Sequence, residues 1–173
     1  MKDGGYICST CGKVHEGLPT DWGFGLPDEV YALSYLEKYR RSRSNADLCA
    51  LDEKRFYFRG LLMIPFTHQE GHFAWGVWVE VSSIVHEFYL GNFSNEMAQG
   101  TRFPGTLANA IPGFTDLVGV PLDVEIQSAK SRPLFSFPAA ARHDLATDQR
   151  GGIGPARHHQ FLELCGYFEG SDA

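Results

Sequence analysis

Residues 54–66, "KRFYFRGLLMIPF", decide the fold, because their composition and alternation are typical of a β-strand. Phe56 and Phe58 alternate with a tyrosine and an arginine, so the two faces of the strand carry different side chains. Gly60 is expected to mark a bulge in this strand. After the turn "THQEGH", residues 73–82, "FAWGVWVEVS", form a second strand. Together the two strands predict an antiparallel hairpin.

The segments around the hairpin predict helices and short strands. Residues 27–42 begin with Pro27 and two acidic residues and carry apolar residues at helical spacing, which favours a helix. Further helices are expected over residues 82–93 and 155–170, and one alternating strand with a shorter partner over residues 122–138. The remaining segments are expected to be loops or short pieces broken by Pro and Gly: residues 1–27, 45–52, 102–121 and 143–154.

The order of these elements predicts the fold class. Helix, hairpin, helix, strands and helix follow one another without strict strand–helix alternation, which indicates an α+β fold. We predict a single α+β domain over residues 1–173, with an antiparallel sheet, flanking helices and a loop-rich N-terminal zinc-knuckle-like lobe over residues 1–27. Trp75 and Trp78 occupy opposite faces of the second strand. One of them is expected in the core, and the other either fills the core or lines a groove.

The charge pattern argues against nucleic acid as a partner. The formal net charge is −6 and the sequence pI is about 5.6, so a phosphate backbone is repelled on average. The basic stretch "KYRRSRS" at residues 38–44 is interpreted as a solvated helix end, where cations offset the negative end of the helix dipole. Nucleic acid is therefore not expected as a partner. The alternative is a nucleic-acid accessory protein that works through Arg40, Arg41 and Arg43.

Membrane insertion and export are not expected either. No apolar run approaches the ~18 residues that span a bilayer, and the N-terminal "MKDGGYICST" lacks the apolar core of a signal peptide. The chain has four cysteines, two of them in a CxxC pattern, which is not the framework of a secreted disulfide scaffold. These features predict a protein of the reducing cytoplasm.

Cys8 and Cys11 form a CxxC motif within "YICSTCGKVH". A redox dithiol of the thioredoxin kind needs a helix at its first cysteine, and the surrounding glycines prevent a helix from starting here. A zinc knuckle fits better, because Gly12 directly after the second cysteine suits the left-handed turn that points both sulfurs at a metal. The motif therefore predicts a structural zinc ion, Zn2+.

One knuckle supplies two ligands, whereas a structural zinc site needs four. Cys49 lies in the polar segment "NADLCALD", and His15 lies four residues beyond the motif. The predicted ligand set is Cys8, Cys11, Cys49 and His15. His68 and His72 flank the hairpin turn and are alternatives for the fourth ligand. Cys165 lies among apolar residues of the last helix and is expected to be a buried, small apolar side chain.

Five ordered patterns resemble a bacterial family known only as domain of unknown function 2199: "CSTCGKVH", "ADLCALD", "FRGLLMIPF", "FAWGVWVEVS" and "HDLATDQRGGI". The resemblance extends from about Tyr6 to Ile153. It brings no activity with it, because we know of none established for that family. It does bring together the cysteines at positions 8, 11 and 49, which supports zinc.

Residues 143–154 hold the catalytic candidates. In an enzyme, His143 would be a general base oriented by Asp144 or Asp148, with Arg150 holding an anionic substrate. The alternative is a polar loop whose side chains cap its own backbone and the next helix. The sequence contains no GxSxG, P-loop, HExxH or dinucleotide fingerprint, so no nucleophile motif accompanies His143.

Two functions from different classes remain. The favoured one is a zinc-stabilised, non-catalytic binding domain for a protein or small-molecule partner. The alternative is a hydrolase that uses His143 with Asp144 or Asp148, or a zinc ion with one open position. The number of protein ligands on the metal would separate them, because four ligands indicate a structural site and three plus water a catalytic one.

Overall fold

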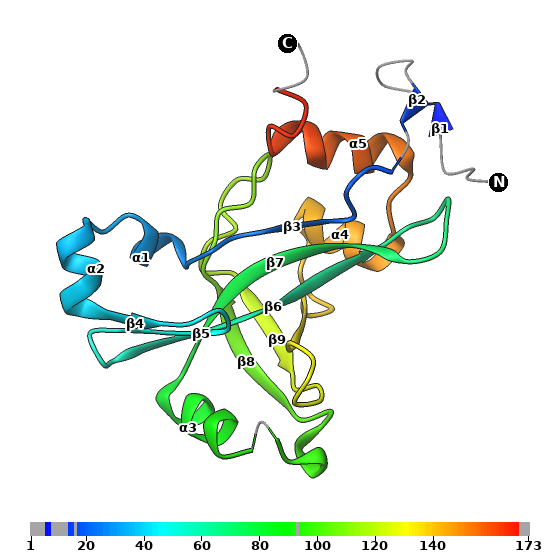
Figure 1. Cartoon of the computed structure of the whole chain (residues 1–173). Helices are drawn as coiled ribbons and strands as arrows, with labels where there is room; N and C mark the ends of the chain where they lie inside the picture. The colour runs from blue at the N-terminus through cyan, green and yellow to red at the C-terminus, as the bar shows by residue number, and fades with distance from the viewer. Residues whose placement is uncertain (1–5, 8–13, 16, 93, 170–173) are drawn as a thin grey trace.

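The computed structural model describes residues 6–7, 14–15, 17–92 and 94–169. Its centre is the hairpin of β6 (Arg55–Pro65) and β7 (His72–Val81), whose antiparallel register runs from Phe56 opposite Val81 to Pro65 opposite His72 (Figure 1). The predicted hairpin is confirmed. The bulge expected at Gly60 is wrong, because Gly60 pairs with Val77 within an uninterrupted register.

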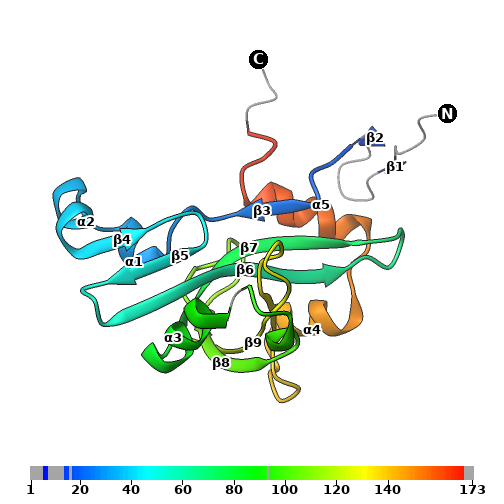
Figure 2. The same cartoon turned by 60° about the horizontal axis from the view of Figure 1, so that its bottom comes forward.

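The sheet closes on itself. β7 pairs with β8 (Arg102–Leu107), β8 with β9 (Pro121–Glu125) and β9 with β10 (Leu134–Ser136), all antiparallel. β10 then pairs with β6 in parallel, so β6 to β10 form a closed five-stranded barrel (Figures 1 and 2). The prediction of an antiparallel sheet is therefore confirmed for most pairs of neighbouring strands. Within the barrel, the exception is the closing pair of β10 and β6, which is parallel.

Three strands extend the sheet beyond the barrel. β5 (Leu48–Leu51) pairs with β6, β4 (Ser42–Ser44) pairs with β5, and β3 (Asp21–Gly23) adds in parallel to β7. β5 corrects the prediction of a turn-like connector over residues 45–52. Its side chains alternate between half-buried and buried, because Cys49 and Leu51 lie in a buried apolar cluster, whereas Leu48 and Ala50 lie on the less buried face.

The predicted zinc-knuckle lobe is not supported in this form. β1 (Tyr6–Ile7) and β2 (Val14–His15) make a separate two-stranded sheet, and Cys8 and Cys11 lie outside the described residues. The last part of the predicted lobe, residues 17–27, instead contains β3 and joins the main sheet.

The helices pack around this sheet. α3 (Ser83–Asn92) and α5 (Pro155–Leu164) confirm the helices predicted over residues 82–93 and 155–170. The single helix expected over residues 27–42 is instead two, α1 (Asp28–Tyr31) and α2 (Tyr35–Arg41), because Ser34 starts a new helix with a capping box to Glu37. A short 3-10 helix spans Glu96–Ala98. Among the described residues, no helix is long and apolar enough to cross a bilayer.

Two further segments differ from the prediction. Residues 143–154 were expected to be a loop, but α4 (Asp144–Gly151) occupies most of them. Residues 102–121 were expected to be broken into short pieces, yet β8 runs through Pro104 and Gly105. Only the end of β8, Thr106 and Leu107, pairs with β7, so Pro104 lies beyond that pairing, where its missing N–H is tolerated.

The β6–β7 hairpin is buried on both faces. Trp75 belongs to the larger core cluster, together with apolar side chains of the barrel, α4 and α5. Trp78 points to the other face, where it packs in a second cluster with Val30, Cys49, Leu51 and Tyr57. Both tryptophans are fully buried, so neither lines a groove.

Gly60 lies where β10 approaches β6. A Cβ atom at this position would lie 2.5 Å from Cζ of Phe135 and 2.6 Å from the carbonyl oxygen of Pro133. The barrel can close only because residue 60 has no side chain. Phe135 instead fills the space above the glycine.

We therefore expect Gly60→Ala to lower the free energy of unfolding by roughly 1–3 kcal/mol, the usual effect of overpacking a core. Gly25→Ala is the control, because a Cβ at Gly25 meets nothing within 4 Å. Urea unfolding of both variants measures the difference. Equal stability of the two variants would show that β10 can shift to accommodate the added methyl group and that closure of the barrel does not depend on Gly60.

Candidate ligand-binding cavity

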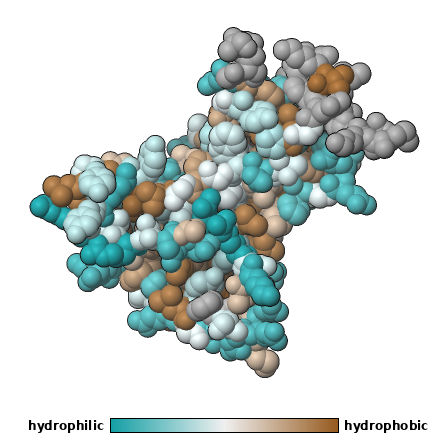
Figure 3. Space-filling model, viewed as in Figure 1, coloured by the Kyte–Doolittle hydropathy of each residue, from teal (hydrophilic) through white to brown (hydrophobic). Residues whose placement is uncertain are grey.

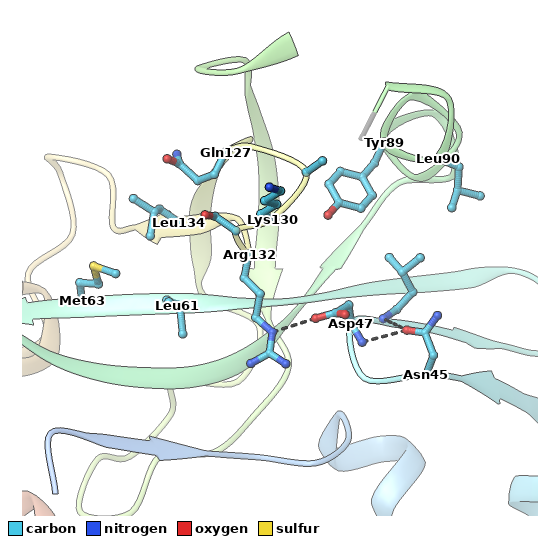
Figure 4. Close-up of a pocket in the computed structure, with 13 residues that line it drawn as sticks. Asn45, Asp47, Leu61, Met63, Tyr89, Leu90, Gln127, Lys130, Arg132 and Leu134 are labelled. Carbon is cyan, nitrogen blue, oxygen red and sulfur yellow. Dashed lines mark hydrogen bonds and ion pairs between the residues drawn. The ribbon is translucent and has the colours of Figure 1, made fainter. Parts of the chain in front are cut away.

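A cavity of about 890 Å³ opens beside β6, between the β4–β5 turn and β10 (Figure 4). Both β5 and β10 flank the same edge of β6. β5 ends its pairing at Phe58, and β10 begins at Leu61. At the junction, the backbone N–H of Arg59 donates to the backbone carbonyl oxygen of Asp47 at 2.9 Å. The backbone N–H of Leu61 donates to the backbone carbonyl oxygen of Pro133 at 3.0 Å. The cavity lies where the two strands diverge.

Apolar side chains form one part of the lining, and polar side chains form the other. The apolar part comes from β5, β6, α3 and β10: Leu48, Leu61, Met63, Leu90 and Leu134. The polar part comes from the β4–β5 turn and the segment before β10: Asn45, Asp47, Gln127, Lys130, Ser131 and Arg132. The cavity is therefore amphipathic, and four separate parts of the chain build it.

The β4–β5 turn and the segment before β10 are joined across the cavity by an ion pair. Nε of Arg132 donates to Oδ1 of Asp47 at 2.8 Å. Asn45 fixes the turn, because its Oδ1 accepts from the N–H groups of Asp47 and Leu48, both at 2.8 Å. Since Asp47 and Arg132 neutralise each other, the charge left over in the lining is that of Lys130. Its ammonium group has no hydrogen bond or ion pair within the described part of the chain.

Tyr89 on α3 adds a hydroxyl to the apolar side. Its ring packs against that of Phe58, with 4.5 Å between centroids, and its side chain points toward the cavity. Burial, and secondarily the charge of Asp47, raises the pKa of Tyr89, so the hydroxyl stays protonated at neutral pH. Among the described residues that line the cavity there is no histidine or cysteine. The lining therefore combines apolar side chains with hydroxyl, amide and charged groups.

The catalytic candidates lie elsewhere, on α4. His143 is the N-cap of this helix, where its Nδ1 accepts from the N–H of Ala146 at 3.1 Å, and its ring packs edge-on against Phe137. Asp148 pairs with Arg157 at 2.8 Å. Asp144 and Arg150 are exposed on the first and last turns of α4. These contacts match the capping alternative, and the catalytic assignment stays a prediction.

The predicted metal ligands are only partly described. Cys8 and Cys11 lie outside the described residues, and of His15 only the backbone, in β2, is described. Cys49 is fully buried in β5, and burial raises the pKa of its thiol to about 11. In Figures 1 and 2, β5 lies toward one end of the molecule, and β1 and β2 lie at the end that carries α5. The ligand set stays a prediction.

Other histidines and Cys165 lie at the α5 end. His158 is buried, with Nε2 2.7 Å from the carbonyl oxygen of Pro19, and its ring centroid is 6.5 Å from that of His68. Cys165 is half-buried against the larger core, and burial raises its pKa to about 11. His72 is exposed at the start of β7. Within the described ranges, no three His, Cys, Asp or Glu side chains are placed to share a metal ion.

The sequence did not point to Asp47, Tyr89, Lys130 or Arg132. They come from segments far apart in the chain and share no local motif, so only the fold brings them together. A cue lay in the segment 127–134, "QSAKSRPL", where two cations, two serines and a proline follow shortly after β9.

The structure is an α+β fold built on a closed five-stranded barrel, with an amphipathic cavity at its seam. The chain belongs to the family of uncharacterised proteins conserved in bacteria called domain of unknown function 2199, whose model matches residues 7–153. This confirms the resemblance seen in the sequence. No curated protein and no solved structure gives a significant match.

The capping contact of His143 predicts a pH-dependent stability. Burial and Arg150 lower the pKa of His143, and Asp144 acts in the opposite sense. Above pH of about 6.5, the ordinary histidine pKa, the ring is neutral in both states and the cap is intact. As the pH falls below this value, the unfolded chain binds the proton first and the free energy of unfolding declines.

We expect His143→Ala to lose about 1 kcal/mol at pH 7.5, because an N-cap acceptor is removed. His143→Asn should keep most of the cap but reduce the loss of stability between pH 7.5 and pH 5. Part of that loss should remain, because burial also lowers the pKa of His86 and His158. Urea unfolding at both pH values tests this. An Asn variant with the wild-type pH dependence would contradict it.

Proposed function

We propose that this domain binds a small amphipathic anion in the cavity beside β6. The observation that supports this is the combination of an apolar wall with one uncompensated cation, Lys130, in a space of about 890 Å³. Ligand sites in proteins occupy roughly 300–1,000 Å³ and pair apolar walls with a few placed polar groups. The proposed ligand carries one anionic group, such as a carboxylate, on an apolar body.

Each part of the cavity has a role in this proposal. The leucines of β5, β6 and β10 and Met63 remove the apolar body from water, which is favourable by roughly 25 cal/mol per Å² of apolar surface. The ammonium of Lys130 binds the anionic group. Arg132 stays paired with Asp47 and holds the two walls at a fixed separation. No bond is made or broken, so the function is recognition.

The hydrolase alternative has less support. It needs His143 beside a substrate, but the Nδ1 atom of His143 is occupied by the helix cap and Asp148 by Arg157. The carboxylate that lines the cavity, Asp47, is likewise occupied by its ion pair with Arg132.

We expect 4-phenylbutyrate to bind about tenfold more tightly than 4-phenylbutanamide, its uncharged counterpart, as for one charge-assisted contact. In Lys130→Met this preference should disappear, because the apolar wall remains and the cation is lost. Lys54→Met, in the turn between β5 and β6, is the matched control and should keep the preference. Isothermal titration calorimetry measures the affinity of both compounds for the wild type and for each of the two variants. If neither compound binds, or if both variants behave alike, the proposal is wrong.

We also propose that Cys8 and Cys11 bind a structural Zn2+. The support is the CxxC–Gly spacing, which suits a knuckle. Cys49 and His15 complete the proposed set. Cys49 would have to lose its proton on binding the metal, and its buried, apolar surroundings oppose the thiolate. Among the four proposed ligands, Cys49 is therefore the informative one to change.

Elemental analysis of the purified protein should find about one zinc per chain, as expected for a single structural site. Cys8→Ser should lose the metal, whereas Cys165→Ser, on the end of α5, should retain it. Cys49→Ser decides the third ligand: loss of zinc assigns Cys49 to the site, and retention removes it from the set. Wild-type protein with less than about a tenth of an equivalent of zinc would refute the site.

A further inference from the structure

α2 turns its apolar half away from the protein. None of its residues is buried, and Tyr35 and Tyr39 are 87% and 74% exposed, with Leu36 at 52%. The opposite half of the helix contacts the turn after β5, where Arg41 forms two hydrogen bonds of 2.9 Å to the carboxylate of Asp52. An isolated helix of this length is marginal in water, and here its two aromatic side chains contribute nothing to a core.

A shallow hollow of about 650 Å³ lies between α2 and β4. It is lined by Tyr35 and Tyr39, by the cations Lys38, Arg40 and Arg43, and by two serines of β4, with no carboxylate among them. In Figure 3, brown, pale and teal residues lie side by side at the end of the molecule where Figure 1 places α2. Aromatic and cationic groups therefore share one surface.

Of the cations on and next to α2, one is neutralised by a carboxylate and three are not. Arg41 is neutralised by Asp52 and lies 3.8 Å from Glu37. Arg43 donates only to backbone oxygens, at 3.1 Å to Tyr39 and 2.8 Å to Ser42, so it keeps its charge. Lys38 and Arg40 have no carboxylate partner within the described residues. Three positive charges remain at the hollow.

The overall charge of −6 does not cancel this local field. At an ionic strength of 0.1 M the screening length is about 10 Å, so carboxylates farther away contribute little at the hollow. Of the nearer carboxylates, Asp52 is paired with Arg41 and Glu37 lies beside the same guanidinium, so the three lining cations still outnumber the remaining negative charge at this surface. The argument from net charge against nucleic acid therefore applies to the whole chain and not to this surface.

We propose that a short stretch of single-stranded nucleic acid docks on this tyrosine–cation surface. Unpaired bases stack on Tyr35 and Tyr39, and the adjoining phosphates contact Lys38, Arg40 and Arg43. A duplex cannot offer its base faces to the tyrosines. A protein partner would need a wider apolar contact, since interface cores are depleted in charge and stable interfaces bury about 800 Å² per partner. This proposal is independent of the ligand in the cavity.

Fluorescence anisotropy with labelled (dT)12 tests the proposal on the full chain. We expect binding at 50 mM NaCl that weakens roughly 20-fold at 200 mM, because three contacted phosphates of a single strand give a log–log slope of about −2. Tyr35→Ala with Tyr39→Ala should weaken binding at least about tenfold and leave the salt slope unchanged, since stacking carries no charge. Arg40→Ala with Arg43→Ala should reduce the slope by about 1.4.

Matched controls lie away from the hollow. Tyr167→Ala and Arg102→Ala remove an exposed tyrosine and an exposed arginine elsewhere and should leave affinity unchanged. Circular dichroism of each variant excludes loss of fold. The proposal is overturned if (dT)12 does not bind at 50 mM NaCl, if the tyrosine variant binds like wild type, or if a 12-base-pair duplex competes equally. Equal competition by poly-glutamate would also overturn it, in favour of an acidic polypeptide.

Discussion

The antiparallel ladder between β6 and β7 is the constraint on which the rest of the structure depends. It places Trp75 in the larger core and Trp78 in the second cluster, and each face therefore needs its own cover. The barrel strands, α4 and α5 supply the side chains that pack on one face, and α1 and β5 supply those on the other. Because side chains alternate with a period of two, a slip of one residue would exchange the two sets of buried side chains. Register and packing therefore enforce each other.

Polar contacts attach α1 to the face of the hairpin that carries the second cluster. Asn109 is fully buried; its Oδ1 accepts from the N–H of Trp78 at 2.7 Å, and its Nδ2 donates to Asp28 at 2.9 Å. Arg55 binds Glu80 at 2.7 Å and 2.8 Å and also contacts Glu29, so one guanidinium joins β6, β7 and α1. These carboxylates raise the pKa of Arg55 further above its usual range. A small helix with one buried residue, Val30, is thus held by directional bonds.

Elements with a local signal could be predicted from the sequence. The alternation of side chains along residues 54–66 and 73–82 predicted the hairpin, and helix-capping residues and the spacing of apolar residues predicted α3 and α5. These cues depend only on residues that are close in sequence. α4 was missed because its residues are polar and its apolar contacts come from two positions, Leu145 and Ala146. The cavity was missed for a related reason: Lys130 and Leu61 become neighbours only when β10 reaches β6. The zinc ligands were chosen from residue chemistry, and the buried position of Cys49 could not be foreseen from a segment with polar flanks.

The seam between β6 and β10 is one of two barrel ladders that are held by only two residue pairs; the other is the ladder between β7 and β8. Only two residue pairs, Leu134 with Leu61 and Phe135 with Leu62, form the parallel ladder there, against ten pairs between β6 and β7. Gln149 reinforces the seam by accepting from the N–H of Phe137 at 2.8 Å and donating to the oxygens of Phe135 and Met63 at 3.2 Å and 3.4 Å. Local opening of a fold concentrates where few backbone bonds and contacts must break. Leu61, Met63 and Leu134 line both this seam and the cavity, so local opening of the barrel at this seam would change the size of the cavity directly.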